Sequence, residues 1–231
     1  MSESPLTRRV WDLPVRITHW ALVLTFAGAY LSHAAGVQYF ALHRWFGYAV
    51  LVLVAFRLAW GFVGTRHARF ANFVRGPRAV LQYLRALPGG AAPPGHNPLG
   101  AVMAVALLAA LAVQALTGLF ANDEIFNAGP LYGYVSDERS LALTSLHRQL
   151  FYWIAAAAGL HVLAVIAHRV FGKHDLVTPM FTGRKPAAQV SAAQEIGRSR
   201  PWLALLLVAT LAATLAYVIA QAPQVTTGSF E

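Results

Sequence analysis

Apolar residues gather in five blocks along the chain, separated by shorter polar stretches. The blocks fall at residues 17–34, 43–63, 98–120, 145–171 and 202–220. Each reaches or approaches the roughly 20 apolar residues that an α-helix needs to cross the hydrocarbon core of a bilayer. The pattern therefore predicts five membrane-spanning helices, the last of which follows a polar linker at 182–201.

The stretches around the first blocks carry further signals. Arg8 and Arg9 precede the first block as in a signal peptide, but the block ends without a good small-residue cleavage site, so we expect a retained helix. Residues 88–97 are rich in proline and glycine, which predicts a loop. Residues 73–87 mix arginines with apolar side chains at helical spacing, which fits a helix along the membrane surface or an ordinary basic loop.

Composition agrees with a membrane protein. Hydrophobic residues make up 57% of the 231 residues, charged residues make up only 12%, and the mean hydropathy is +0.51. A soluble domain of this length would carry more charge and less apolar bulk. The chain has no cysteine, which excludes disulfides, thiolate metal sites, iron–sulfur clusters held by this chain and covalent haem attachment through a Cys-x-x-Cys-His motif.

The net charge of +9 is distributed unevenly between alternate loops. Thirteen of the 18 basic residues lie before the first block, between the second and third blocks, or between the fourth and fifth. The other loops hold Arg139 beside four acidic residues, namely Asp123, Glu124, Asp137 and Glu138. The positive-inside rule then predicts a cytoplasmic N-terminus and an outer C-terminus. Membrane topology thus explains the basic residues better than nucleic-acid binding does.

Histidines inside the apolar blocks are candidates for function because an ionisable group is costly within a membrane. On a helix, His147 and His161 would share one face and lie about 21 Å apart along the axis. His19 begins the first block, so the predicted orientation brings it to the depth of His161. His43 begins the second block, at the depth of His147. Two opposed histidine pairs at two depths suit two b-type haems with two axial imidazoles each.

Other histidines compete with this assignment or lie outside it. His33 is fourteen residues after His19 and is an alternative outer ligand, but it lies at a fraying helix end, so we favour His43. His168 lies at the basic border of the fourth block, and we expect it at the interface, near a haem propionate or a quinone. The loop histidines are expected to be solvated: His67, His96 and His174.

Three arginines suit the same arrangement. Arg44 and Arg148 each follow a proposed outer ligand, and Arg57 is fourteen residues after His43, on the same helical face. A buried guanidinium needs an anion, and the propionates of a haem are carboxylates that arginine binds well. Snorkelling to lipid phosphate is the alternative interpretation, and it is as good for Arg148.

Several motifs along residues 8–186 are characteristic in combination. They are VWDLPVRITHW at 10–20, HRWFGY at 43–48, FRLAWGFVGTRHARFANFVRGP at 56–77, GHNPLG at 95–100, the fourth-block pattern H-x13-H-x6-H, and MFTGRK at 180–185. Together they resemble the bacterial cytochrome b561 family, which includes the b-type cytochrome subunits of nickel–iron hydrogenases.

The resemblance implies an all-α membrane protein with a four-helix haem-binding bundle over 8–186. Residues 187–231 would add a linker, a fifth transmembrane helix and a short outer tail. The family's haem ligands fall on the four histidines chosen above: His19, His43, His147 and His161. The resemblance also implies two non-covalent b-type haems and electron transfer across the bacterial inner membrane, between the quinone pool and an outer partner such as a c-type cytochrome or a hydrogenase.

Two other functions remain open on the sequence. The first is a self-sufficient oxidoreductase, an activity known among members of the resembled family, which would pass electrons from superoxide to quinone without a partner protein. A non-redox membrane anchor would use the histidines only to hold helices together, and would show no haem absorption. A transporter is disfavoured because the apolar blocks contain few acidic residues to couple ions.

Overall fold

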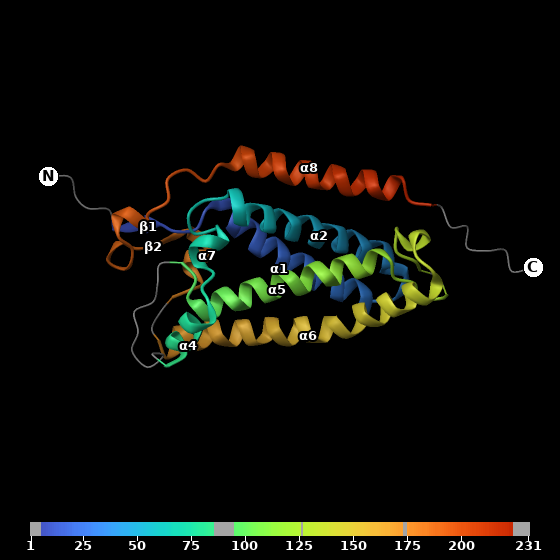
Figure 1. The fold of residues 1–231 in the computed structure, drawn as a ribbon, viewed down its shortest axis with the longest axis horizontal. Helices are drawn as coiled ribbons and strands as arrows, with labels where there is room; N and C mark the ends of the chain where they lie inside the picture. The colour runs from blue at the N-terminus through green and yellow to red at the C-terminus, as the bar shows by residue number, and fades with distance from the viewer. Residues whose placement is uncertain (1–5, 86–94, 126, 173–174, 224–231) are drawn as a thin grey trace, which may run out of the picture. The chain divides into compact units, whose positions relative to one another are not determined.

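A computed structural model describes residues 6–85, 95–125, 127–172 and 175–223. Five long helices account for the five apolar blocks (Figure 1). They are α1 (Leu13–Ala34), α2 (Phe40–Val63), α5 (Pro98–Leu119), α6 (Asp137–Val170) and α8 (Pro201–Ala220). The all-α character predicted from the apolar blocks is therefore confirmed.

Four helical segments of the described chain are long and apolar enough to cross a membrane. They are Val37–Val63, Pro98–Leu119, Asp137–Val170 and Pro201–Ala220. The C-terminal α8 is among them, whereas α1 is not. Arg16, His19 and His33 lie within α1, and such polar side chains lower its hydropathy. A fifth crossing, by α1, stays a prediction.

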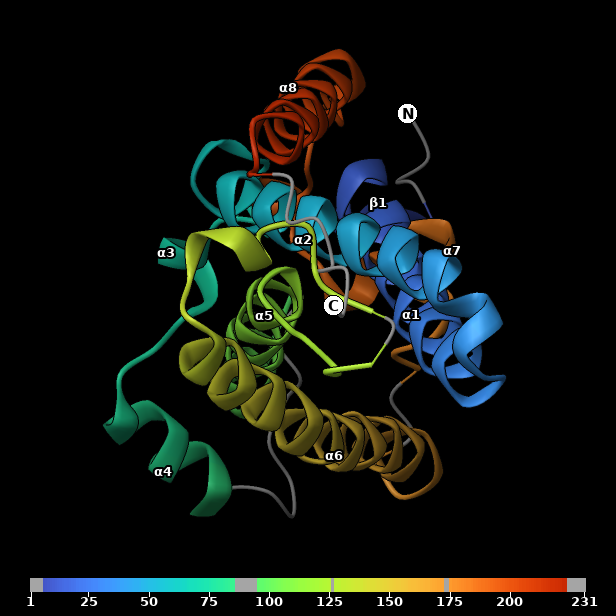
Figure 2. The same cartoon turned by 90° about the vertical axis from the view of Figure 1, so that its right-hand side faces the viewer.

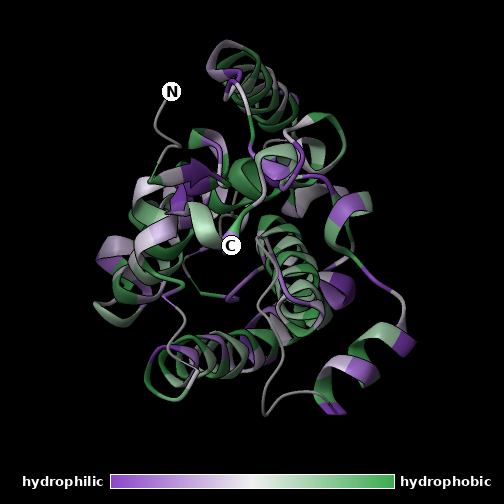
Figure 3. Cartoon of the chain, turned by 90° about the vertical axis from the view of Figure 1, so that its left-hand side faces the viewer, coloured by the Kyte–Doolittle hydropathy of each residue, from purple (hydrophilic) through white to green (hydrophobic). Residues whose placement is uncertain are grey.

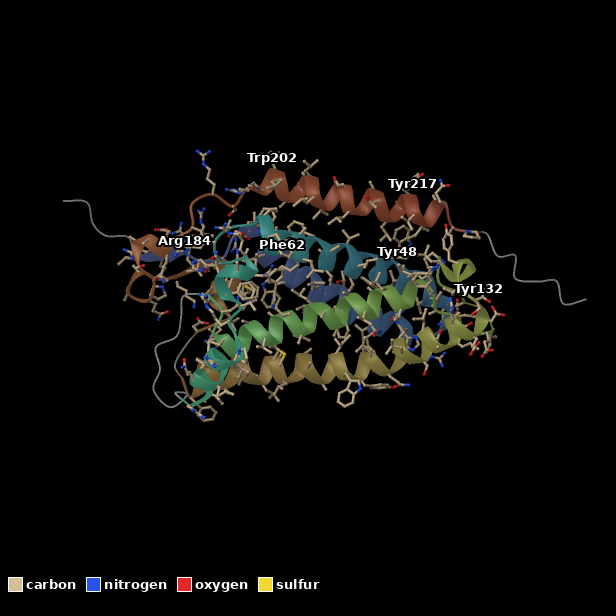
Figure 4. The ribbon with its side chains drawn as sticks, in the orientation of Figure 1. Tyr48, Phe62, Tyr132, Arg184, Trp202 and Tyr217 are labelled. Atoms are coloured by element: carbon tan, nitrogen blue, oxygen red, sulfur yellow. The ribbon has the colours of Figure 1, made fainter. Side chains whose placement is uncertain are left out.

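The ends of α8 carry exposed amphipathic aromatic side chains. Trp202 is 81% exposed and Tyr217 is 68% exposed, and they lie near opposite ends of the helix (Figure 4). Tryptophan and tyrosine are enriched where a transmembrane helix meets the two membrane–water interfaces. The positions of Trp202 and Tyr217 near the two ends of α8 are therefore consistent with a transmembrane helix that faces lipid.

The basic stretch at 73–87 contains a helix. After the short α3 (Phe70–Phe73), α4 spans Pro77–Arg85 and begins with a proline, which suits the first helical turn because that position needs no N–H partner. Its hydrophilic and hydrophobic residues are both evident in Figure 3. Of the two interpretations offered by the sequence, a helix is correct, and its place along the membrane surface stays a prediction.

The polar linker before α8 folds back on the N-terminal segment. Strand β1 (Thr7–Arg9) pairs antiparallel with β2 (Arg184–Pro186), which follows the short α7 (Thr178–Thr182). Two 3-10 turns follow at Ala187–Gln189 and Ala192–Gln194. Val190 is 1% exposed and Ile196 is 6% exposed. The segment is therefore an integral part of the fold rather than a free tether.

The chain divides into two compact units that share the long helices. The first unit comprises Met1–Trp20, Phe56–Leu108 and Ala156–Leu205, and its core includes the buried Trp60 and Phe56. The second unit comprises Ala21–Ala55, Ala109–Ala155 and Leu206–Glu231.

Within the second unit, α1 lies beside α2 and α5 lies beside α6 (Figure 2). Its core is a cluster of Leu119, Leu131 and Ala222, against which Tyr48 and Leu51 pack. Tyr134 donates a hydrogen bond to the carbonyl of Gln221, 3.0 Å away. These contacts hold the end of α8 within this unit.

Candidate functional site

In the second unit, His43 of α2 faces His147 of α6. Their ring centroids are 6.2 Å apart, with the ring planes at 82°. Two imidazoles bound to one metal ion have centroids about 6 Å apart, because each bond is about 2 Å long and each ring adds about 1 Å. The spacing therefore suits two axial ligands of one metal ion.

Backbone carbonyls fix the tautomer of both rings. His43 Nδ1 lies 2.8 Å from the carbonyl oxygen of Ala29, and His147 Nδ1 lies 2.8 Å from that of Gln114. Because a carbonyl oxygen only accepts, each Nδ1 must carry the donated proton. Each Nε2 then keeps its lone pair, which is the arrangement that metal-binding histidines use.

One turn of α5 supports His147. The hydroxyl of Thr117 is 3.3 Å from His147 Nδ1, and a Cβ at Gly118 would come within 2.9 Å of the Cε1 atom of that ring. The side-chain Oε1 of Gln114 is buried and has no hydrogen-bond partner in the described chain. Sequence reasoning missed these residues, although a glutamine, a threonine and a glycine within an apolar block were the available signal.

His33 lies close to the same place. Its ring centroid is 5.7 Å from that of His43, so three of the predicted histidines come together in the second unit. His33 is exposed, whereas His43 and His147 are partly buried. The geometry thus favours His43 over His33 as the partner of His147.

Two of the predicted arginines in the second unit are exposed. The Arg44 guanidinium lies 5.6 Å from the ring centroid of Phe40. Arg148 lines a polar cavity of about 240 Å³ with Asp123 and Glu124. Because both guanidiniums are exposed, lipid headgroups or water can accept their hydrogen bonds and balance their charge as well as a haem propionate would.

In the first unit, His19 of α1 and His161 of α6 are close enough to interact electrostatically. His19 Nδ1 is buried and has no hydrogen-bond partner among the described residues. Its ring contacts Trp20 edge-on at 4.9 Å, and Trp20 stacks on Phe181 at 4.4 Å. The two histidines therefore lie within electrostatic range of each other in one unit, and their tautomers are not fixed.

Arg57 is the buried arginine of the first unit, with 7% of its surface exposed. It donates a hydrogen bond to the carbonyl of Ala68, 3.2 Å away, and lies 5.3 Å from the ring centroid of Phe70 and 6.0 Å from that of Phe73. No carboxylate of the described chain forms an ion pair with it. Arg57 interacts electrostatically with the buried Asp12, and its five N–H donors leave room for a further acceptor.

The buried carboxylate of the first unit already has its donors. Asp12 accepts hydrogen bonds from the backbone N–H of Val15 at 2.8 Å, the indole of Trp60 at 3.0 Å and the hydroxyl of Thr65 at 2.6 Å. It is 1% exposed. Asp12 therefore caps α1 and ties it to α2, and its role is structural.

The loop histidines His67 and His96 are partly buried, which corrects the expectation that both are solvated. His67 Nε2 bonds the carbonyl of Gln194 at 2.8 Å, and burial lowers the pKa of His67. His96 contacts Trp11 at 4.8 Å and Phe73 at 4.5 Å between ring centroids. Burial, aided by nearby positive charge, lowers the pKa of His96 to about 3. The folded loops partly bury both side chains, which spacing along the sequence cannot reveal.

The two remaining histidines add little to the site. His168 is partly buried near the end of α6, which agrees with a border position. His174 lies outside the described residues.

Comparison with known proteins gives one match. A family model described as prokaryotic cytochrome b561 matches residues 10–183, which is about three quarters of the 231 residues. No curated protein and no solved structure matches. The matched segment contains the four paired histidines, the three arginines and His96, whereas α8 lies beyond it.

Proposed function

The chain belongs to the prokaryotic cytochrome b561 family, and on that premise we propose that it is a di-haem cytochrome that moves electrons between the quinone pool and a redox partner. Membership makes it a membrane b-type cytochrome in electron transfer. Beyond family membership, we propose how many haems the chain binds, which residues hold them, and that a quinone and a redox partner exchange electrons with it.

The observation that carries the proposal is the pair His43 and His147. Two imidazoles 6.2 Å apart, each with Nδ1 held by a backbone carbonyl, leave two Nε2 lone pairs for one iron atom. A bare metal ion would need more protein ligands. The described residues contain no group of three or more histidine, cysteine or acidic side chains that could hold one. A porphyrin supplies its own four nitrogens, so two histidines suffice.

His19 and His161 are proposed as the ligands of the second haem. The buried Nδ1 of His19 without a partner supports this assignment, because a buried polar atom is costly unless something satisfies it. Arg57 supplies positive charge to a haem propionate in the same unit. Arg44 and Arg148 are proposed as propionate partners of the first haem, at the exposed edge of its site.

The bound haems supply the redox chemistry. The four histidines of this chain would hold the haems, and the carbonyls of Ala29 and Gln114 fix the tautomers of His43 and His147. The apolar helices would keep water out, and these features together would tune the reduction potential. In the proposed orientation the N-terminus lies in the cytoplasm of a bacterium and the C-terminus outside the inner membrane. His43 and His147 then lie on the outer side, where a c-type cytochrome or hydrogenase-like partner would dock.

A reduced-minus-oxidised spectrum with a haem count on the purified chain tests this function. We expect two b-type haems per chain and reduction of both after addition of a short-chain quinol. A protein without haem absorption would contradict the proposal and indicate a membrane anchor. If the chain alone catalyses steady electron transfer from superoxide to quinone, then superoxide is the electron donor and no partner protein is needed.

A further inference from the structure

An apolar groove lies against α4 in the first unit, and it has no role in the proposed haem sites. Its volume is about 450 Å³, within the roughly 300–1,000 Å³ of typical ligand pockets. Leu81, Leu84 and Val102 are exposed, so the described chain leaves the groove open. The lining residues come from α4, from the segment before it and from α5: Arg75, Pro77, Val80, Leu81, Leu84 and Val102.

The sequence of α4 separates apolar side chains from basic ones. The apolar residues share one face because they follow the helical spacing i, i+3, i+4 and i+7. They are Pro77, Val80, Leu81 and Leu84. Arg78 and Arg85 are seven residues apart, so they lie together on an adjoining face. The helix therefore suits a boundary between an apolar and a charged environment.

The charge around the groove is entirely positive. Residues 64–85 contain no acidic side chain, and no ion pair of the described chain involves Arg75, Arg78 or Arg85. Arg75, the charged residue of the lining, donates one hydrogen bond to the carbonyl of Asn72, 3.1 Å away. Most of its five N–H donors therefore stay available, and a guanidinium binds a phosphate through two of them at once.

Arg75 and the apolar lining follow one another along the groove. Arg75 lies two positions before the first residue of α4, where the start of the helix adds partial positive charge. From Pro77 to Leu84 the helix then rises about 10 Å, and Val102 lies about 6 Å along the apolar α5. The groove thus offers positive charge at one end and an apolar path toward a membrane-spanning helix beyond it.

We propose that this groove binds an anionic phospholipid, with phosphatidylglycerol as the probe. Arg75 pairs with the phosphate, and one acyl chain lies along Val80, Leu84 and Val102. Charge complementarity selects this occupant, because a net negative headgroup balances the three arginines and a zwitterionic one does not. The predicted orientation also puts α4 on the cytoplasmic side, where anionic lipids attract basic segments. The inference does not depend on the number of haems or on the redox partner.

Native mass spectrometry of the purified full-length chain tests the charged end of the site. Phosphatidylglycerol should bind about fivefold more tightly than phosphatidylcholine with the same acyl chains. Arg75→Gln should remove that preference, and Arg75→Lys, which keeps the charge, should lose less of it. Arg69→Gln is the matched control, because Arg69 is exposed in the same basic stretch but does not line the groove. It should bind phosphatidylglycerol as the wild type does.

Equal affinity of the wild type for the two lipids would overturn the proposal without recourse to a variant. An equal loss in Arg75→Gln and Arg69→Gln would also overturn it, because the effect would then come from net charge rather than from a site. The haem count of each variant should equal that of the wild type, which verifies folding.

The apolar end is tested by filling the groove. Leu84→Trp should weaken the binding of both lipids severalfold, because the indole occupies the space of the acyl chain. Leu205→Trp is the control, because Leu205 is exposed on α8 and does not line the groove. Unchanged lipid binding in Leu84→Trp would overturn the placement of the chain. A dimer of the wild type that Leu84→Trp disrupts would assign the groove to a second copy of the chain and overturn the lipid site.

Discussion

The two histidine pairs are built differently. In the second unit, carbonyl oxygens of Ala29 and Gln114 hold His43 and His147 with their Nε2 atoms free. In the first unit, His19 Nδ1 is buried without a partner in the described chain. The second-unit pair is thus preorganised by backbone, whereas the first-unit pair depends on what it binds to complete its hydrogen bonds.

The charge around the pairs differs as well. Arg57 is buried in the first unit, where it interacts electrostatically with the negative charge of the buried Asp12. In the second unit, Arg44 and Arg148 are exposed, so solvent or lipid headgroups screen them. A haem beside Arg57 would therefore respond more strongly to the loss of that arginine's charge than a haem beside Arg44 or Arg148 would, because solvent screens a buried charge less.

The largest expected effect comes from removing a ligand of the preorganised pair. His43→Ala and His147→Ala should each lower the haem count of the purified chain from two to one, because one imidazole cannot hold a b-type haem firmly. The neighbouring His33→Ala should keep both haems. Loss of haem in His33→Ala with retention in His43→Ala would reverse the ligand assignment.

The next effect concerns the buried charge of the first unit. Arg57→Met should lower the midpoint potential of one haem by on the order of 50 mV, since removing a positive charge disfavours the added electron. Arg57→Lys keeps the charge and should shift the potential less. Spectropotentiometric titration measures both. Equal shifts of both haems in Arg57→Met would show that Arg57 does not belong to one site.

A smaller effect is expected from crowding His147. In Gly118→Ala the new Cβ would come within 2.9 Å of His147 Cε1, so the ring must shift away from the Gln114 carbonyl. We expect haem affinity to fall severalfold at one site, measured by haem transfer to apomyoglobin. Gly47→Ala is the control, because its Cβ meets nothing within 4 Å. Equal haem loss from both variants would attribute the effect to the helices rather than to His147.

The smallest effect is on acid stability. The pKa of His96 is about 3 in the folded chain and about 6.5 in an unfolded one. Between these values the unfolded chain binds a proton that the folded chain does not, so stability is full above pH 6.5 and falls as the pH drops toward 3. Thermal unfolding at pH 7 and pH 5 should show a fall in Tm of a few degrees, and His96→Phe should make that fall smaller without abolishing it, since the pKa of His67 is lowered by burial as well. An identical fall in both proteins would mean that His96 is solvated.

The contact between His43 and His147 was predictable, because the order of the apolar blocks puts both histidines toward the same ends of neighbouring helices. Fourteen residues make nearly four turns, so His147 and His161 must share a face of α6. The helix boundaries were less predictable, because α6 begins at Asp137, ahead of its apolar block. Backbone N–H groups bonded to Ser136 start that helix, and hydropathy does not register such a cap.

The supporting contacts could not be predicted. The carbonyls of Ala29 and Gln114 belong to the backbone, which every residue has, so no residue type marks them. The burial of His96 depends on Trp11 and Phe73, which are distant in sequence. Folding of the linker against β1 likewise depends on the pairing of β1 with β2, which lie just outside the two ends of the matched segment. Local pattern does not encode such a long-range contact.

The central claim is that each unit holds one haem between its own two histidines. The most direct measurement is the haem count of two double variants, His43→Ala/His147→Ala and His19→Ala/His161→Ala, with midpoint potentials of the haem that remains. We predict one haem per chain in each variant, with a different midpoint potential in each, since only the first unit holds a buried proposed propionate partner, Arg57. Two haems in either variant, or none in both, would contradict it.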